Sequence, residues 1–281
     1  MEFGRKYDEA LRSYNVCFFA YSDVYCSPIY IIRINAIWFL GLILSKFYYL
    51  KKVSKSSNIN IHVAAISAFV ANQLEQVDPY PFCKNPLDFF HVGNLGSYSQ
   101  NVDKLINDLI TEAEKQNPLW EPKNKSTISG FQTSNNIFQV GKTFSMLEEF
   151  IIQEIEAYYS KFSTESCSLI KLWPTNYTIK GWYVRLVKDG HQTSHIHRDG
   201  WISGVVYLKT VSTAGTNEGS IELGLHGYEL PVINQNYPRK IHYPRTADII
   251  LFPSSLFHKT IPFSKRANRC VVAFDLIPSR P

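Results

Sequence analysis

The pattern of apolar and polar positions divides the chain into a helical part followed by a strand-rich part. Over about the first 77 residues, apolar side chains recur at helical spacing and proline is scarce. The last helix predicted there runs from about Ile61 to Gln76. Asp78-Pro79-Tyr80-Pro81 then breaks the pattern, because proline disfavours helix at itself and at the residue before it. We therefore expect two segments, 1–77 and 78–281.

The second segment is predicted to contain two helices and then a series of strands. The helices lie near Val102–Lys115 and Phe144–Phe162, and apolar residues at helical spacing line one face of the second. After Trp173-Pro174, short β-rich runs alternate with Gly, Pro, Asn and Asp. The runs are Trp182–Val187, Ser203–Lys209, Ser220–Leu223, Ala247–Phe252 and Arg269–Leu276. Strands without intervening helices favour an antiparallel sandwich or barrel, with the earlier helices packed on one sheet.

A spacing of small and larger residues occurs twice in the first segment. Gly4, Tyr7 and Ala10 follow one another at intervals of three, and the pattern restarts at Gly41 with Leu44 and Phe47 in the other places. This resembles a degenerate tetratricopeptide repeat, in which small residues let paired helices pack closely. A repeat array normally needs about three units for stability. The first segment is therefore either a remnant of an array or a helical cap docked on the second segment.

Composition and charge exclude some classes of protein. The hydrophobic content of 45% indicates a globular fold, and the net charge of +5 comes without a Lys/Arg run, so we expect no nucleic-acid partner. A membrane helix is not expected in Ile29–Leu50, because its uncharged part, Ile34–Ser45, is shorter than the span of about 20 residues. The five cysteines form no CxxC pair, and the start does not resemble a signal peptide. Reduced thiols in the cytoplasm are the expectation.

The residues that can carry chemistry gather just before one predicted strand, within GHQTSHIHRDGW. Residues two apart share a face of an extended segment, so His195, His197 and Asp199 can point the same way. His258 lies at the end of another predicted strand, in ADIILFPSSLFH, and Arg269 opens the last one. The remaining histidines lack such partners. We expect surface or capping roles for His62, His91, His226 and His242, and a loop position for His191, with orientation of a metal ligand as its alternative role.

This set of residues suits a non-haem iron site. Fe(II) oxygenases favour two histidines and one carboxylate on one face of the metal, which leaves the opposite face open for substrate and O2. Coordination chemistry alone favours His197 and Asp199 as the close pair, because that choice supplies a carboxylate, with His258 as the distant ligand. A buried Arg269 beside the site would hold the far carboxylate of 2-oxoglutarate through a bidentate, charge-assisted bond.

At these residues the sequence resembles the 2-oxoglutarate–Fe(II) oxygenase superfamily, and more closely the oxygenase domains found C-terminal to tetratricopeptide repeats in bacterial proteins. The resembling blocks, from roughly Pro79 to Pro278, are PFCKNPLDFFHVG, WEPKNKSTISGFQTSNNIF, GHQTSHIHRDGWISGVVYL, ADIILFPSSLFHKTIPF and RCVVAFDL. The resemblance implies a double-stranded β-helix, or jelly roll, with helices packed against one sheet. The expected fold class is thus α+β, preceded by a small all-α segment.

The resemblance also implies cofactors and residue roles. The cofactors are Fe(II) and 2-oxoglutarate, with ascorbate as a candidate reductant. His258 matches the distal iron ligand and Arg269 the co-substrate clamp. Relatives tend to have His-Ile-His-Pro where this chain has His195-Ile196-His197-Arg198, which makes His195 and His197 the close pair, with Asp199 as the alternative to one of them. An all-histidine site would leave more net positive charge on the iron.

The implied activity is hydroxylation of an unidentified substrate by O2, coupled to conversion of 2-oxoglutarate to succinate and CO2. Repeat modules commonly bind peptides, so a protein substrate or partner is expected to dock through the N-terminal helices. Two alternatives stay open. One is a catalytically inactive jelly-roll module for binding or sensing, and the other is a cupin-like metalloenzyme that does not use 2-oxoglutarate and does not need Arg269.

Overall fold

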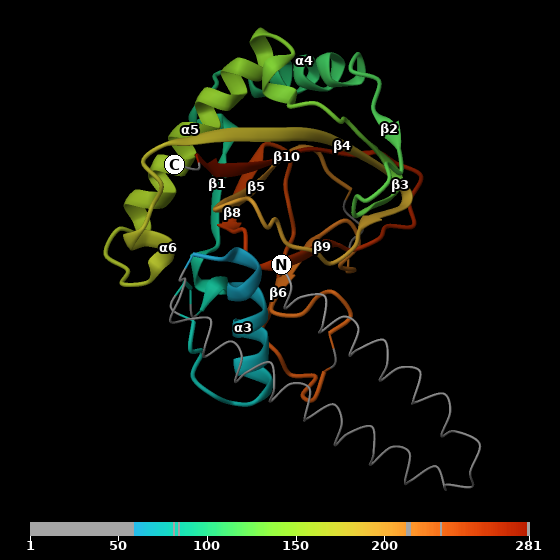
Figure 1. Cartoon of the computed structure of the whole chain (residues 1–281). Coiled ribbons are helices and arrows are strands. Elements are labelled where there is room, and N and C mark those ends of the chain that lie inside the picture. The colour runs from blue at the N-terminus through green and yellow to red at the C-terminus, as the bar shows by residue number, and fades with distance from the viewer. Residues whose placement is uncertain (1–58, 81, 84, 212–214, 231, 280–281) are drawn as a thin grey trace, which may run out of the picture. The chain divides into compact units, whose positions relative to one another are not determined.

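The computed structural model describes residues 59–279, apart from 81, 84, 212–214 and 231 (Figure 1). The repeat-like pattern from Gly4 to Phe47 and the apolar stretch Ile29–Leu50 lie outside these residues. The chain divides into two units between Ser45 and Lys46, and everything described belongs to the second unit. Within the described ranges, no helix combines the length and the apolar character that a membrane crossing requires. The boundary between residues 77 and 78 stays a prediction.

Two antiparallel β-sheets form most of the described structure (Figure 1). The larger has seven strands in the order β1-β8-β5-β10-β4-β3-β2, and the smaller has three in the order β7-β6-β9. The strands of the larger sheet are β1 (His91–Asn94), β2 (Leu119–Trp120), β3 (Thr127–Gln132), β4 (Tyr177–Gln192), β5 (Ile202–Lys209), β8 (Asp248–Pro253) and β10 (Arg269–Pro278). Those of the smaller sheet are β6 (Ile221–Gly224), β7 (Arg239–His242) and β9 (Phe257–Thr260). The predicted antiparallel, strand-rich architecture is confirmed.

Helices cover the outer face of the larger sheet. They are α4 (Val102–Glu114) and α5 (Lys142–Phe162), and Figure 1 shows both above the strands. Their buried residues recur at helical spacing and form the main core with one face of the sheet. The remaining helical segments are α3 (Ile61–Gln73), α6 (Ser168–Lys171) and the short 3-10 turns η1 (Pro86–Phe89), η2 (Leu95–Ser97) and η3 (Ile137–Gln139). The two helices predicted after residue 100 are confirmed.

Helix α3 packs on the strand-rich part of the chain. Asn60 caps its first turn by accepting a hydrogen bond from the backbone N–H of Val63 at 3.0 Å. Ile61 and Ala64 join the main core, and the Gln73 amide oxygen accepts hydrogen bonds from the backbone of the loop at residues 233–234. This helix was predicted as part of the N-terminal segment, and its position is that of a cap docked on the sheets.

Alternation along the strands separates the core from the space between the sheets. On β10, Cys270, Val272 and Phe274 belong to the main core beneath the helices. Because side chains alternate along a strand, Arg269 and Asp275 lie on the opposite face, toward the smaller sheet. On β5 the residues of this inner face are Ser203, Val205 and Tyr207. The inner faces therefore carry polar side chains inside an otherwise apolar sandwich.

Candidate metal centre

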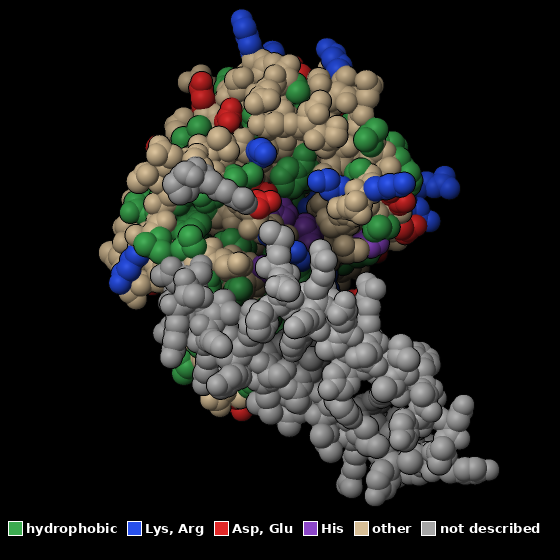
Figure 2. All heavy atoms as spheres, in the orientation of Figure 1, with side chains coloured by type: hydrophobic (Ala, Val, Ile, Leu, Met, Phe, Trp, Pro, Cys, Tyr) green, Lys and Arg blue, Asp and Glu red, His purple; other side chains and the backbone are tan. Residues whose placement is uncertain are grey.

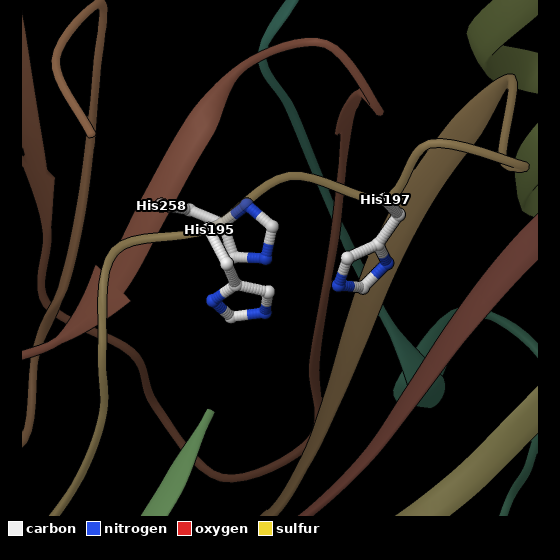
Figure 3. Close-up of side chains that lie close together, drawn as sticks. All are labelled: His195, His197 and His258. Carbon is white, nitrogen blue, oxygen red and sulfur yellow. The ribbon is translucent and has the colours of Figure 1, made fainter. Parts of the chain in front are cut away.

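Three histidines converge between the two sheets (Figure 3). The ligand nitrogens of His195, His197 and His258 all lie within 4.8 Å of one another. His195 and His258 form an antiparallel bridge in which the backbone N–H of each donates to the carbonyl of the other at 3.1 Å. The backbone N–H of His197 donates to the carbonyl of Ser254 at 3.2 Å. These backbone bonds bring together residues that lie far apart in the sequence.

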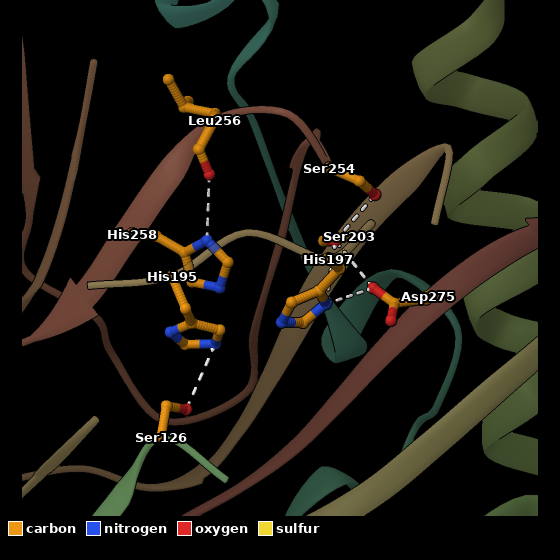
Figure 4. Close-up of polar contacts among 8 residues, drawn as sticks. All are labelled: Ser126, His195, His197, Ser203, Ser254, Leu256, His258 and Asp275. Carbon is orange, nitrogen blue, oxygen red and sulfur yellow. Dashed lines mark hydrogen bonds and ion pairs between the residues drawn. The ribbon is translucent and has the colours of Figure 1, made fainter. Parts of the chain in front are cut away.

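Hydrogen bonds at Nδ1 set the tautomer of two of the rings. The Nδ1 atom of His195 lies 2.6 Å from the carbonyl oxygen of Thr193. The Nδ1 atom of His258 lies 3.1 Å from the carbonyl oxygen of Leu256 (Figure 4). A carbonyl oxygen can only accept, so each Nδ1 carries the proton and each Nε2 keeps its lone pair. The Ser126 hydroxyl, 3.3 Å from Nε2 of His195, therefore donates to that lone pair.

The third ring is held by a carboxylate. Nδ1 of His197 lies 2.5 Å from Oδ1 of Asp275, which also accepts a hydrogen bond from the Ser203 hydroxyl at 2.7 Å (Figure 4). A carboxylate oxygen only accepts, so His197 donates through Nδ1 and its Nε2 keeps a lone pair, as in the other two rings. All three rings can thus offer Nε2 to one metal ion, as histidine ligands with a fixed second nitrogen commonly do.

Burial keeps two of the rings neutral at physiological pH. Burial lowers the pKa of His195 to about 4, and the neighbouring His197 contributes in the same direction. The pKa of His258 is held well below its usual range by burial and by the two other histidines. A neutral imidazole is the form that binds metal, so no proton has to be displaced from these two Nε2 atoms.

Asp199 lies outside this group. The chain turns after His197, where the backbone N–H of Gly200 donates to the His197 carbonyl at 3.2 Å, and Asp199 is exposed. The extended geometry that puts residues two apart on one face holds from His195 to His197 and ends there. Within the described ranges, the potential ligands that gather in one place are three histidines without a carboxylate.

His258 was predicted at the end of the strand that begins near Ala247, and this placement is wrong. Strand β8 ends at Pro253, and a turn closed by the Leu256 N–H and the Pro253 carbonyl at 2.9 Å leads into β9. The turn carries the chain from the larger sheet to the smaller one. His258 therefore faces His195 and His197 from a strand of the smaller sheet.

Arg269 is a buried cation without an anionic partner in the described part of the chain. Its side chain is 1% exposed, its Nε donates to the Gly219 carbonyl at 3.1 Å, and its Nη1 has no hydrogen-bond partner. None of the ion pairs of the described residues includes it. Burial lowers its pKa, but a guanidinium stays charged in proteins. An unpaired buried charge is costly, so the guanidinium is a candidate partner for an anion.

Tyr207 is a polar residue of this site that the sequence did not distinguish from core aromatics. Its ring centroid is 5.1 Å from the guanidinium carbon of Arg269, and its buried hydroxyl has no hydrogen-bond partner. Burial raises the pKa of Tyr207 to about 12, so the phenol keeps its proton and can donate. Tyr207 and Arg269 interact with each other, and the phenol proton and Nη1 are donors that one acid group can accept from.

A small cavity joins these residues. It is lined by the three histidines, Trp182, Phe252 and Arg269 among others, and its free volume is about 20 Å³. Figure 2 shows histidine side chains in a hollow of this face of the molecule. The volume suits about one water-sized group, and hence a metal ion. A five-carbon diacid that reached from the histidines to Arg269 would require lining side chains to move.

Some other aromatic and histidine residues lie at the cavity, in the main core, at the end of a strand or in a buried ion pair. Trp182 lines the cavity with its ring centroid 5.4 Å from that of His197, whereas Tyr183 and Trp201 belong to the main core. His191 lies near the end of β4 rather than in a loop, and bonds the carbonyl of Asp189. The prediction of a surface or capping role is wrong for His91, which pairs with the buried Glu154 at 2.5 Å.

A comparison with protein families finds one match, and the matched residues include those of this site. Residues 180–275 match the family model described as "Putative 2OG-Fe(II) oxygenase". The matched range runs from β4 into β10 and includes the three histidines, Arg269 and Asp275. The match covers less than half of the chain and shows that this part of it is similar to that family. No curated protein matches the chain.

Several solved structures share a distant likeness. A prolyl-4-hydroxylase from Pseudomonas putida has a TM-score of 0.46 at 8% identity, over 68% of this chain and 93% of that one. HygX from Streptomyces hygroscopicus, with nickel and 2-oxoglutarate bound, has a TM-score of 0.48 at 14% identity, over 68% and 83%. A prolyl hydroxylase from Trichoplax adhaerens, in complex with a peptide fragment of hypoxia inducible factor, has 0.45 at 12%, over 77% and 90%. At these values the likeness carries no argument about activity or substrate.

Proposed function

We propose that this chain is an Fe(II)- and 2-oxoglutarate-dependent oxygenase that hydroxylates a substrate not yet identified. The observation that carries the proposal is one cavity that holds three histidines able to offer Nε2 and a buried arginine without an anionic partner among the described residues. His195, His197 and His258 would hold the metal, with Asp199 as the alternative to one of the first two. Arg269, joined by Tyr207, would hold the far carboxylate of 2-oxoglutarate.

A jelly-roll arrangement of the strands supports this proposal. From β4 onward the chain crosses several times between the sheets: β4, β5, β8 and β10 lie in the larger one, and β6, β7 and β9 in the smaller one, where β6 and β7 are consecutive. The bridge between His195 and His258 places the segment around His195 beside β9, as a fourth strand position of the smaller sheet. Four strand positions then face four, as in a double-stranded β-helix. His195 and His197 lie between the sheets because both belong to the bridge segment, residues 195–197, which pairs with β9 through His195.

Each residue has a task that follows from its position. Bound Fe(II) would supply the activation of O2 that couples oxidation of 2-oxoglutarate, to succinate and CO2, with hydroxylation of the substrate. The Nδ1 hydrogen bonds keep each histidine in the tautomer that presents Nε2. Arg269 orients the acid by a charge-assisted bond, and Phe252 covers His258 at a ring-centroid distance of 4.8 Å, which limits access of water.

The direct test is succinate release from 2-oxoglutarate by the full chain supplied with Fe(II) and ascorbate. We expect turnover by the wild type, none above background in His258→Ala, and wild-type turnover in His191→Ala. His191 is a matched control because it belongs to the same sequence run and bonds the carbonyl of Asp189 instead of joining the three histidines. Equal turnover in wild type and His258→Ala contradicts the proposal. Metal binding without turnover in the wild type favours the inactive binding or sensor module.

We propose a protein as the class of substrate. A protein substrate that docks through the N-terminal helices is supported by the repeat-like pattern of the sequence, which lies outside the described residues. The test is a comparison of the full chain with peptide and small-molecule substrates in the succinate assay. Stimulation by peptides supports a protein substrate, and stimulation by small molecules alone contradicts it.

A further inference from the structure

The three-histidine group has a carboxylate directly behind it. Asp275 lies on the inner face of β10, is 7% exposed and is 2.5 Å from Nδ1 of His197 (Figure 4). It does not belong to the set whose ligand atoms gather within 4.8 Å. Asp275 therefore contacts a candidate ligand on the side away from the metal position, and it is not itself a candidate ligand.

The position of Asp275 is fixed from several sides. Ser203 lies opposite Asp275 in the register of β5 and β10, and its hydroxyl donates to Oδ1 at 2.7 Å. The Ser203 hydroxyl also lies 2.8 Å from that of Ser254, whose carbonyl accepts from the backbone of His197. A Cβ at Gly200 would come within 2.6 Å of the Ser254 hydroxyl and 3.2 Å of the Asp275 carboxyl carbon. Because glycine has no Cβ, the backbone at residue 200 can lie against Ser254 and Asp275.

The charge of Asp275 has no cationic side chain to neutralise it in the described structure. Its ion-pair partner there is His197, and neither Lys nor Arg pairs with it. A buried carboxylate is costly unless hydrogen bonds and a positive charge compensate for it. A dipositive ion on the Nε2 of His197 would supply that charge through the ring. The burial of Asp275 thus makes sense in the metal-bound state.

We infer that Asp275 is a positioning residue that supplies, through His197, the negative charge that three histidine ligands lack. The inference rests on the proposed function. It accounts for how a site without a carboxylate ligand can resemble the usual site of two histidines and one carboxylate. The carboxylate fixes the orientation of the His197 ring and makes Nε2 a stronger donor, as an acid behind a histidine ligand does at other metal sites.

The chain contains a matched control for this inference. Glu154 is 4% exposed and lies 2.5 Å from a nitrogen of His91, so it is a second buried pair of carboxylate and histidine. It belongs to α5 on the helix side of the larger sheet, away from the three histidines. Loss of either carboxylate disturbs a buried pair, and only Asp275 contacts a residue of the metal site.

The experiment is titration of the metal-free full chain with Co(II), without 2-oxoglutarate, followed by calorimetry and by the visible Co(II) spectrum. We compare the wild type with Asp275→Asn, Ser203→Ala and Glu154→Gln. Asparagine keeps the size of Asp275 and an oxygen that can accept from His197, and removes the charge. We expect Asp275→Asn to weaken Co(II) binding by about 10- to 100-fold and to change the Co(II) spectrum. Ser203→Ala should weaken binding less, and Glu154→Gln should match the wild type in both readouts.

The outcomes separate failure of the inference about Asp275 from failure of the proposed function. Wild-type affinity and spectrum in Asp275→Asn overturn the inference and leave the proposed function standing. Equal weakening in Asp275→Asn and Glu154→Gln overturns it too, because the effect is then one of general stability. Absence of Co(II) binding in the wild type overturns the proposed function itself. If Asp275→Asn does not fold, Ser203→Ala decides the matter, and an unchanged affinity and spectrum there overturn the inference.

Discussion

At the scale of single residues, the site contains buried polar groups that lack partners in the described structure. Arg269 is the clearest of them, because its guanidinium lies in the interior with Nη1 unused and no carboxylate paired to it among the described residues. Proteins commonly accept such a cost at functional positions and recover stability elsewhere. Loss of the Arg269 charge should therefore weaken the binding of 2-oxoglutarate far more than it lowers the free energy of unfolding.

We predict that Arg269→Met weakens 2-oxoglutarate binding by at least about tenfold, because hydrogen bonds to charged groups contribute about 1.5–3 kcal/mol. The free energy of unfolding should fall by no more than about 1 kcal/mol, the worth of the bond to the Gly219 carbonyl. Binding is measured calorimetrically on the metal-loaded chain, and unfolding with denaturant on the metal-free chain. Arg185→Met is the control, since Arg185 pairs with Glu114 at 2.8 Å in a different region. Unchanged 2-oxoglutarate affinity in Arg269→Met would contradict the role of Arg269 in holding this acid.

The sequence pointed to part of this residue set and missed the rest. Spacing and resemblance named His195, His197, His258 and Arg269, and the structure brings these four to one cavity. Asp275 was overlooked because it reads as an ordinary polar residue within RCVVAFDL. Alternation along that strand was the available signal, since residues 269, 271, 273 and 275 share a face. Nothing in the sequence marks the register that places Asp275 beside Ser203.

At the scale of elements, buried polar contacts connect the helices to the larger sheet. Glu154 lies among apolar residues of α5, where it accepts hydrogen bonds from His91 on β1 at 2.5 Å and from the Tyr98 hydroxyl at 2.8 Å. Burial alone would raise the pKa of Glu154, but these two hydrogen bonds outweigh it and leave the pKa below its ordinary value of 4.5. The ionised form is thus the one that the fold stabilises.

We predict that Glu154→Gln lowers the free energy of unfolding at neutral pH by about 1–3 kcal/mol, the cost of leaving a buried polar partner unsatisfied. The pKa of Glu154 is lower in the folded state than in the unfolded state, so its contribution is complete above about pH 4.5 and is lost as the pH falls below it. Denaturant unfolding of both proteins between neutral pH and pH 4 measures this. A difference that grows on acidification would contradict the assignment.

We also predict that Gly204→Ala destabilises the contact between β5 and β10. A Cβ at Gly204 would overlap the ring of Phe274, which is fully buried in the main core. The expected loss is about 1–3 kcal/mol in the free energy of unfolding, the usual cost of overpacking a core. Thermal unfolding of the metal-free chain measures it. The control is Gln153→Ala at an exposed position of α5, which should leave the stability nearly unchanged, and equal stability of the two variants would refute the packing argument.

Periodicity predicted the long elements and missed the short ones. The helices α4 and α5 and the strands β5 and β10 have many apolar positions, so helical spacing and β-rich runs identify them. Strands β1, β7 and β9 have four residues each, too few to establish a period. β9 was therefore merged with the preceding strand, and His258 was placed on the wrong element.

At the scale of the whole described unit, the site depends on crossings between two sheets. His195 and His258 are distant in sequence, and they meet because the chain crosses several times between the sheets after β4. Local pattern cannot predict such pairing, since any antiparallel order of these strands satisfies the same alternation. The spacing and coordination chemistry of the histidines, together with the resemblance to oxygenases, supplied the expectation that these residues meet.

A metal bound to these histidines should stabilise the unit, because it connects the bridge segment to β9. We predict that Co(II) at about 100 times its dissociation constant raises the free energy of unfolding by about 2.7 kcal/mol. His258→Ala should show no such rise, and His191→Ala should show the full rise. Thermal unfolding with and without Co(II) measures it. Equal stabilisation of wild type and His258→Ala would place the metal elsewhere in the chain.

The most direct test of the central claim is the absorption spectrum of the Fe(II)-loaded chain, titrated with 2-oxoglutarate in the absence of O2. The account predicts a change in the visible spectrum that saturates when the two are equimolar and is absent in His258→Ala. In Arg269→Met the same change should require at least about tenfold more 2-oxoglutarate, from the loss of its charge-assisted bond. No spectral change in the wild type, or an identical change in His258→Ala, would contradict the claim that these histidines and Arg269 form one site for iron and 2-oxoglutarate.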